Sequence, residues 1–245
     1  MQLNIAKCKV ITFSRKRVSN RFLCDYAING EVIKRCTVMN DLGVLLDEKV
    51  NMNEHVDNIC KKAMKIFGLV KRQAKIFDDP YVTKSLFCSL VRPILEYCTV
   101  AWMPFTKEQC NRLESVQKQF LLFALRNLGW RDRYVLPSYR SRLRLLNMDT
   151  LNDRRIVSSC VFMYKLMNEM INVKYLKDKL IANDSIYITR NRASLIQISH
   201  STDYGMNEPL TRMIRFYNLY EECFLNNGSI SAFKSKIKNK LFVND

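Results

Sequence analysis

The stretch that decides the fold is NEHVDNICKKAMKIFGLVKRQAK, residues 53–75. Plotted at 100° per residue, its apolar side chains fall within one arc of roughly 120°, as in an amphipathic α-helix that buries one face. These side chains are Val56, Ile59, Cys60, Ala63, Ile66, Phe67, Val70 and Ala74. Asn53 suits the N-cap position, and Glu54 in the first turn complements the helix dipole. The stretch therefore predicts a long helix packed against a core.

The opposite face of this predicted helix is basic. Its cations share an arc of about 80° and are Lys61, Lys65, Arg72 and Lys75. Charge on an amphipathic helix often only keeps that face in water, whereas aligned cations can also contact the phosphates of a nucleic acid. The composition favours phosphate contact, because 40 Lys and Arg against 23 Asp and Glu leave a formal net charge of +17. Such an excess attracts polyanions.

Helical patterns continue after this stretch. PYVTKSLFCSLVRPILEYC (residues 80–98) is apolar almost all round, which predicts a buried central helix with a kink or break at Pro93. TKEQCNRLESVQKQFLLFALRNLG (residues 106–129) opens with a capping box formed by Thr106 and Gln109. Further helices are expected over about 150–170, over 208–224 and at the C-terminal end.

The first fifty residues instead have β patterns. KVITFS (residues 9–14) and LGVLLD (residues 42–47) are predicted to be strands, and Asn29-Gly30 between two apolar stretches predicts a tight hairpin. The chain is therefore predicted to be mainly α with a small N-terminal β portion (α+β), in which a helical bundle follows short strands and a hairpin.

The sequence IFDDP contains two adjacent acidic residues, Asp78 and Asp79, that resemble the metal-holding pair of a polymerase. Such a pair must lie on a hairpin, so that both carboxylates reach two metal ions. Here the flanking segments are helical, and Asp79 before Pro80 matches an N-cap followed by proline at the first helical position. We therefore predict a helix cap, with no catalytic residue and no metal ligand in this chain.

A second basic cluster follows the predicted helix over residues 106–129. It comprises Arg131, Arg133, Arg140, Arg142 and Arg144. Tyr134 and Tyr139 lie between these arginines and are equally suited to stack on bases or to pack beneath the helices. Arg154 and Arg155 lie at a predicted helix N-terminus, where positive charge opposes the dipole. This placement indicates an anionic partner or a nearby carboxylate, for which Asp149 and Asp153 are the candidates.

Several classes of protein are disfavoured by the composition. No apolar run approaches the roughly 20 residues of a spanning helix, and the first residues lack a cleavable signal pattern. The nine cysteines are odd in number and none is spaced as a zinc pair, while two histidines are too few for a His-based metal centre. We expect an intracellular protein, cytoplasmic or nuclear, without a disulfide framework.

LNIAKCKVITFSR and VMNDLGVLLDEKVNMNEHVDNICKKAMK together resemble the segment after the catalytic palm motif in reverse transcriptases of non-LTR retrotransposons, the jockey-like elements in particular. The resemblance continues through SLVRPILEYCTVAWMP, RLESVQKQFLLFALR, LNDRRIVSSCVFMYKL and PLTRMIRFYNLY, and so spans almost the whole chain. No one of these motifs is decisive, and the resemblance rests on their order.

This resemblance implies roles for three regions. Residues 1–52 would be the end of the palm with a primer-grip-like β portion, in which Leu42, Gly43 and Val44 match the primer grip. Residues 53–130 would form a thumb-like helical region that clasps an RNA–DNA duplex, and residues 131–245 a C-terminal helical region. The family motif with the catalytic aspartates precedes the segment at which this chain starts, so the resemblance implies a truncated RNA-directed DNA polymerase. The full-length family enzyme would use Mg²⁺, and this chain is expected to hold no cofactor.

The expected activity is electrostatic binding of RNA, DNA or an RNA–DNA hybrid, without polymerisation and without a membrane partner. The missing palm and finger region would be the protein partner. The alternative is a helical interaction or scaffold protein with no role in nucleic-acid binding, whose strands expose unpaired edges.

Overall fold

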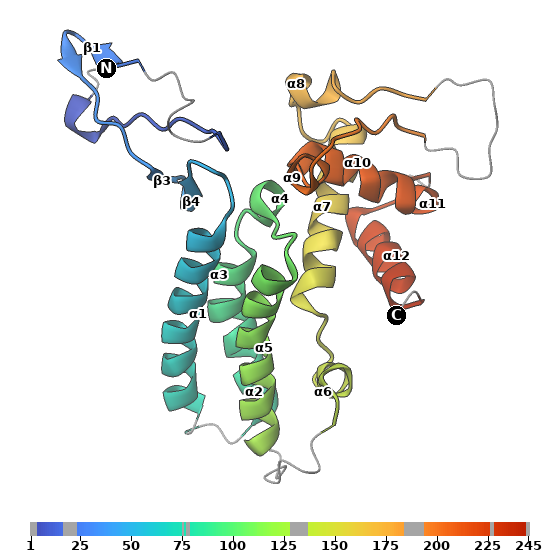
Figure 1. Ribbon diagram of the computed structural model, residues 1–245. Coiled ribbons are helices and arrows are strands. Elements are labelled where there is room, and N and C mark those ends of the chain that lie inside the picture. Colours follow the sequence, from blue (N-terminus) through green and yellow to red (C-terminus); the bar gives the residue numbers. More distant parts are fainter. Residues whose placement is uncertain are drawn as a thin grey trace.

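A computed structural model describes residues 4–16, 24–74, 76, 79–127, 137–183, 194–225 and 228–243. The described chain is mainly α with a small N-terminal β portion, as predicted. Figure 1 shows two groups of helices side by side, with the β portion beyond one end of the first group.

The β portion consists of a short 3-10 turn, η1 (Ile5–Lys7), and two hairpins. Their strands are β1 (Ala27–Ile28), β2 (Glu31–Val32), β3 (Val38–Asp41) and β4 (Val44–Asp47). The first hairpin turns at Asn29-Gly30, where φ is +52° and +84°, as this dipeptide predicted. The predicted strand over residues 9–14 was wrong, because only an isolated bridge from Val10 to Arg35 forms there.

The strand predicted over residues 42–47 is shorter in the structure, where it belongs to the second hairpin. Leu42 and Gly43 form its two-residue turn with φ of +45° and +89°, and β4 begins at Val44, which pairs with Asp41. A two-residue turn of this kind needs positive φ at both positions. Gly43 adopts that conformation without a steric cost, and a local strand pattern could not reveal that Leu42 would share it.

The first helical group is built on α1 (Asn53–Ala74). Its other members are α2 (Pro80–Leu86), the π-helical turn η3 (Phe87–Val91), α3 (Arg92–Glu96), α4 (Thr99–Trp102) and α5 (Lys107–Asn127). The predicted apolar face of α1 is confirmed: six of its eight residues are buried, and Cys60 and Ile66 are half-buried. The predicted N-cap was displaced, because Asn53 already lies in the helix and the Asn51 side chain accepts its N–H at 2.9 Å.

The segment predicted as a buried central helix is helical from Pro80 to Glu96 and is interrupted just before Pro93, as predicted, but it is not buried on all sides. The segment is divided into α2, η3 and α3, and its buried side chains recur at every fourth position, as Thr83, Phe87, Val91 and Leu95. Leu90 and Tyr97 on other faces are 47% and 55% exposed. The irregular turn precedes Pro93, which has no N–H to continue an α-helical ladder.

The second helical group is arranged around α7 (Leu151–Met167), with the short α6 (Tyr139–Leu145) before it. The remaining elements are α8 (Lys174–Lys177), α9 (Asp203–Met206), α10 (Pro209–Leu219), α11 (Glu221–Phe224) and α12 (Ile230–Val243). In Figure 1, α10 and α12 lie on the side of α7 that faces away from α1, and both pack against α7.

Two hydrophobic cores correspond to these groups. In the first, Phe120 stacks on Phe87 with ring centroids 4.0 Å apart, and both lie near Phe67. In the second, Tyr164 stacks on Phe233 at 4.3 Å. Leu143, Leu146 and Leu151 also belong to the first core, so its packing continues past residue 130. The three regions proposed from the sequence stay a prediction.

Candidate nucleic-acid interface

The outer face of α1 is positively charged and open to solvent. Lys61, Lys65 and Arg72 are exposed, and none of them has an ion-pair or hydrogen-bond partner within the described part of the chain. They fall within about 40° of one another around the helix and span about 16 Å along it. Lys75, the fourth predicted residue of this face, lies outside the described residues. We call Lys61, Lys65 and Arg72 the α1 basic face.

One further cation lies beside the α1 basic face. Lys62 is exposed on the same helix, and residue spacing did not place it on this face because it falls outside the arc shared by the other cations. The Lys61-Lys62 doublet was the signal that could have identified it. With the apolar side of α1 held in the core against α5, these cations can be presented to a ligand without rearrangement of the helix.

The second predicted cluster is only partly described. Arg131, Arg133 and Tyr134 lie outside the described residues, and Arg140 and Arg144 are exposed on α6. Arg142 differs, because it is half-buried and two of its enclosed guanidinium nitrogens form no hydrogen bond to any residue in the described ranges. In Figure 1, α1 and α6 lie on opposite flanks of the first helical group. The structure therefore does not bring the described residues of the two clusters together.

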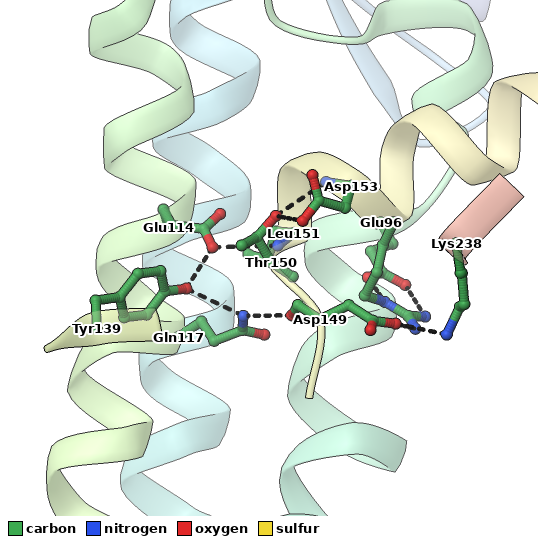
Figure 2. Close-up of polar contacts among 10 residues, drawn as sticks. Glu96, Glu114, Gln117, Tyr139, Asp149, Thr150, Leu151, Asp153 and Lys238 are labelled. Atoms are coloured by element: carbon green, nitrogen blue, oxygen red, sulfur yellow. Dashed lines mark hydrogen bonds and ion pairs between the residues drawn. The ribbon is translucent and has the colours of Figure 1, made fainter. Parts of the chain in front are cut away.

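Tyr139 packs beneath the helices and does not present its ring for base stacking. Its hydroxyl donates to the Glu114 carboxylate and accepts a hydrogen bond of 3.2 Å from the Gln117 amide (Figure 2). Glu114 also accepts from the Leu151 N–H at 3.1 Å. Burial raises the pKa of both Tyr139 and Glu114. Of the two roles open for this tyrosine, the contacts support the structural one.

The three primer-grip-like positions form the tip of the second hairpin. Leu42 is 86% exposed, Gly43 lies in the turn, and Val44 is buried. The Tyr97 hydroxyl donates to the Leu42 carbonyl at 3.0 Å, which ties the hairpin tip to the chain between α3 and α4. A Cβ added at Gly43 would lie 3.4 Å from the Tyr97 ring, so the turn and this ring approach closely. Contact of this tip with a primer stays a prediction.

His55 in α1 holds the same hairpin against the helix. Its Nδ1 accepts the Leu45 N–H at 3.2 Å, and its ring meets Trp102 edge-on with centroids 4.5 Å apart. Because Nδ1 is an acceptor, it must be unprotonated in this arrangement. Burial lowers the pKa of His55, and the charge of Lys62 lowers it further.

We expect the folded state to lose stability as pH falls from about 7.5 to about 5.5. The unfolded state takes up a proton near the ordinary histidine pKa of 6.5, whereas the folded state resists it. The stabilisation is therefore complete above that pKa and is progressively lost as pH falls from it toward the lowered pKa of the folded state, by about 1 kcal/mol per pH unit. Urea unfolding at the two pH values measures this difference.

The matched variants for this measurement are His55→Gln and His200→Gln. The pH dependence should shrink in His55→Gln and persist in His200→Gln. Equal pH dependence in wild type and His55→Gln would contradict the assignment to His55.

Asp79 is a helix cap, as predicted. Its side chain accepts the Tyr81 N–H at 2.7 Å, and Pro80 occupies the first turn of α2. Asp78 lies outside the described residues. In the part of the chain that the structure describes, no group of three His, Cys, Asp or Glu residues is placed to hold a metal ion. All nine cysteines are free thiols, and burial raises the pKa of Cys60 to about 11.

The two arginines at the start of α7 differ in their contacts with carboxylates. Arg154 forms a two-point ion pair with Glu96 on α3, including a bond of 2.9 Å from Nη2 to Oε2. The expected carboxylate Asp149 lies 4.0 Å from Arg154, but the main partner is Glu96, which is distant in sequence and was not predicted. Arg155 is 1% exposed, and its guanidinium nitrogens form no hydrogen bond within the described residues.

Comparisons with known proteins identify no relative: no family model, no curated protein and no solved structure matches this chain. None of the helices in the described ranges is long and apolar enough to cross a membrane.

Proposed function

We propose that this chain binds the sugar-phosphate backbone of nucleic acid, largely without regard to sequence, through the α1 basic face. The observation that carries the proposal is that Lys61, Lys65 and Arg72 are exposed, aligned and without partners among the described residues. Side chains that already share an ion pair would have to break it to contact phosphate. These three are available at no such cost.

The dimensions of this face suit a nucleic-acid strand. The three cations span about 16 Å, which corresponds to about five steps of 3.4 Å along one strand of a duplex. Contact of this kind positions a backbone and does not read bases. It agrees with the thumb-like role that the resemblance to non-LTR reverse transcriptases implies, and RNA, DNA and RNA–DNA hybrids are the proposed partners.

The dependence of affinity on salt tests this proposal. If each of the three cations neutralises one phosphate, the logarithm of the association constant should fall against the logarithm of salt concentration with a slope of about −2.7 for B-form DNA. Fluorescence anisotropy with a labelled 20-base-pair duplex measures it, and an RNA–DNA hybrid of the same sequence is compared alongside. Affinity that does not change between about 50 and 200 mM salt contradicts electrostatic binding.

A protein-interaction role is the second candidate, and the hairpin tip favours it. Leu42 at 86% and Tyr97 at 55% exposure are joined by a hydrogen bond and together expose apolar surface. Exposed apolar side chains that cluster can mark a protein contact. Self-association that persists at high salt, in sedimentation measurements over a range of concentrations, would favour this role over nucleic-acid binding.

A further inference from the structure

A cavity of about 410 Å³ lies between α7 and α12. Its wall includes Arg154, Arg155 and Ser158 from α7, and Lys234 and Lys238 from α12. Glu96, at the end of α3, is the carboxylate that lines it. Figure 2 shows Glu96 and Lys238 approaching this region from different elements. The lining thus brings together four cations and one anion from three helices that are far apart in the sequence.

The carboxylates that pair with Arg154 and Lys238 are already engaged. Glu96 forms the two-point ion pair with Arg154. Asp149, just before α7, accepts a hydrogen bond of 2.6 Å from Lys238 and lies 4.0 Å from Arg154. Lys234 is exposed and has no partner within the described residues. Arg154 and Lys238 are therefore paired, Arg155 has Glu114 and Asp153 nearby, and Lys234 is the cation of the lining that is left without a carboxylate partner within the described residues.

Arg155 lies within the wall of the cavity. It lines this cavity and also a second one, of about 250 Å³, that Cys110 and Glu114 line on the α5 side. Its guanidinium nitrogens are enclosed, so they do not reach into the cavity, and they form no hydrogen bond within the described residues. The carboxylates of Glu114 and Asp153 lie near Arg155 and offset its charge, so Arg155 is not counted toward ligand binding.

We propose that the cavity between α7 and α12 binds a phosphomonoester dianion. Lys234 supplies an unpaired cation at the cavity wall, and Lys238 and the Ser158 hydroxyl supply further donors to phosphate oxygens. The volume lies in the range of small-ligand sites, about 300–1,000 Å³, and so leaves room for the group that carries the phosphate. In Figure 1, α12 lies on the far side of the molecule from α1, so this site is separate from the α1 basic face.

Isothermal titration of the full chain with AMP, with adenosine as the uncharged comparison, tests the proposal at about 50 mM salt. AMP is expected to bind and adenosine is not. Lys234→Glu should weaken AMP binding about tenfold, because it reverses the unpaired charge at the wall. Lys236→Glu is the matched control: it makes the same change on an exposed residue of α12 that does not line the cavity, and AMP affinity should stay within about twofold.

Ser158→Asp is a second route to the same effect, since it places a carboxylate in the cavity from α7. It should weaken AMP binding as well. Equal binding of AMP and adenosine, equal effects of Lys234→Glu and Lys236→Glu, or no AMP binding would each overturn the proposal.

Two further ligands distinguish the source of the phosphate. Preference for a 5′-phosphorylated oligonucleotide over its 5′-hydroxyl form would support the proposal and identify a strand end as the source. Preference for AMP over both the phosphorylated oligonucleotide and inorganic phosphate would support it and identify a free nucleotide. AMP binding should survive charge reversal of the α1 basic face, so this site and the proposed duplex-binding function can fail independently.

Discussion

Reversing the three charges of the α1 basic face, by Lys61→Glu, Lys65→Glu and Arg72→Glu together, is expected to weaken duplex binding about a thousandfold at 50 mM salt. Each lost phosphate contact removes about 0.9 from the salt slope, so the slope should approach zero if these residues are the whole contact face. The new carboxylates would also repel the phosphates. The same anisotropy titration, repeated at four salt concentrations, measures both quantities.

The control is a triple variant with the same change in net charge at exposed residues on other elements. Lys107→Glu, Lys174→Glu and Lys236→Glu provide it, on α5, α8 and α12. This variant should keep most of the affinity and most of the slope, because exposed charges farther away than a Debye length are largely screened. An equal loss in the two triple variants would show that net charge, and not the α1 basic face, drives binding.

Phe120→Ala is expected to lower the free energy of unfolding by about 3–5 kcal/mol. Phe120 is fully buried and stacks on Phe87, with Phe67 meeting it edge-on at 6.1 Å. Its removal would leave a cavity between α1, η3 and α5 that rigid helices fill poorly, so lost transfer energy and lost packing add. Urea unfolding followed by far-ultraviolet circular dichroism measures the change.

Phe13→Ala makes the same chemical change at a side chain that is 50% exposed, and it should cost much less. If Phe120→Ala cost no more than Phe13→Ala, the aromatic cluster would not be the centre of the first core.

Local sequence patterns predicted those features that depend on neighbouring residues. The period of 3.6 in α1 identified its buried face, and Asn29-Gly30 and Asp79-Pro80 marked a hairpin turn and a helix start. The predicted burial of residues 80–98 on all sides was wrong, because the segment is apolar on several sides. Periodicity cannot select one buried face when all faces are apolar, and packing against α1 and α5 made that selection.

Polar contacts between residues distant in sequence were also not predictable from local patterns. Thr106 caps α5 as the capping box predicted, with the Gln109 N–H at 3.3 Å from its hydroxyl. The Gln109 side chain does not complete the box. It donates instead to the Asn51 carbonyl at 2.6 Å, from a segment 58 residues earlier, because the fold places that acceptor within reach.

The sequence by itself determined that α1 would have an apolar face and a basic face, since both follow from residue spacing within one helix. Only the tertiary structure decided which other residues of the predicted sites stay available to a ligand. Arg154 is neutralised by Glu96, Tyr139 is withdrawn into hydrogen bonds with Glu114 and Gln117, and Arg155 is enclosed between two cavities. Charge pairing depends on distance in space, and residues 58 positions apart become neighbours only when the helices pack.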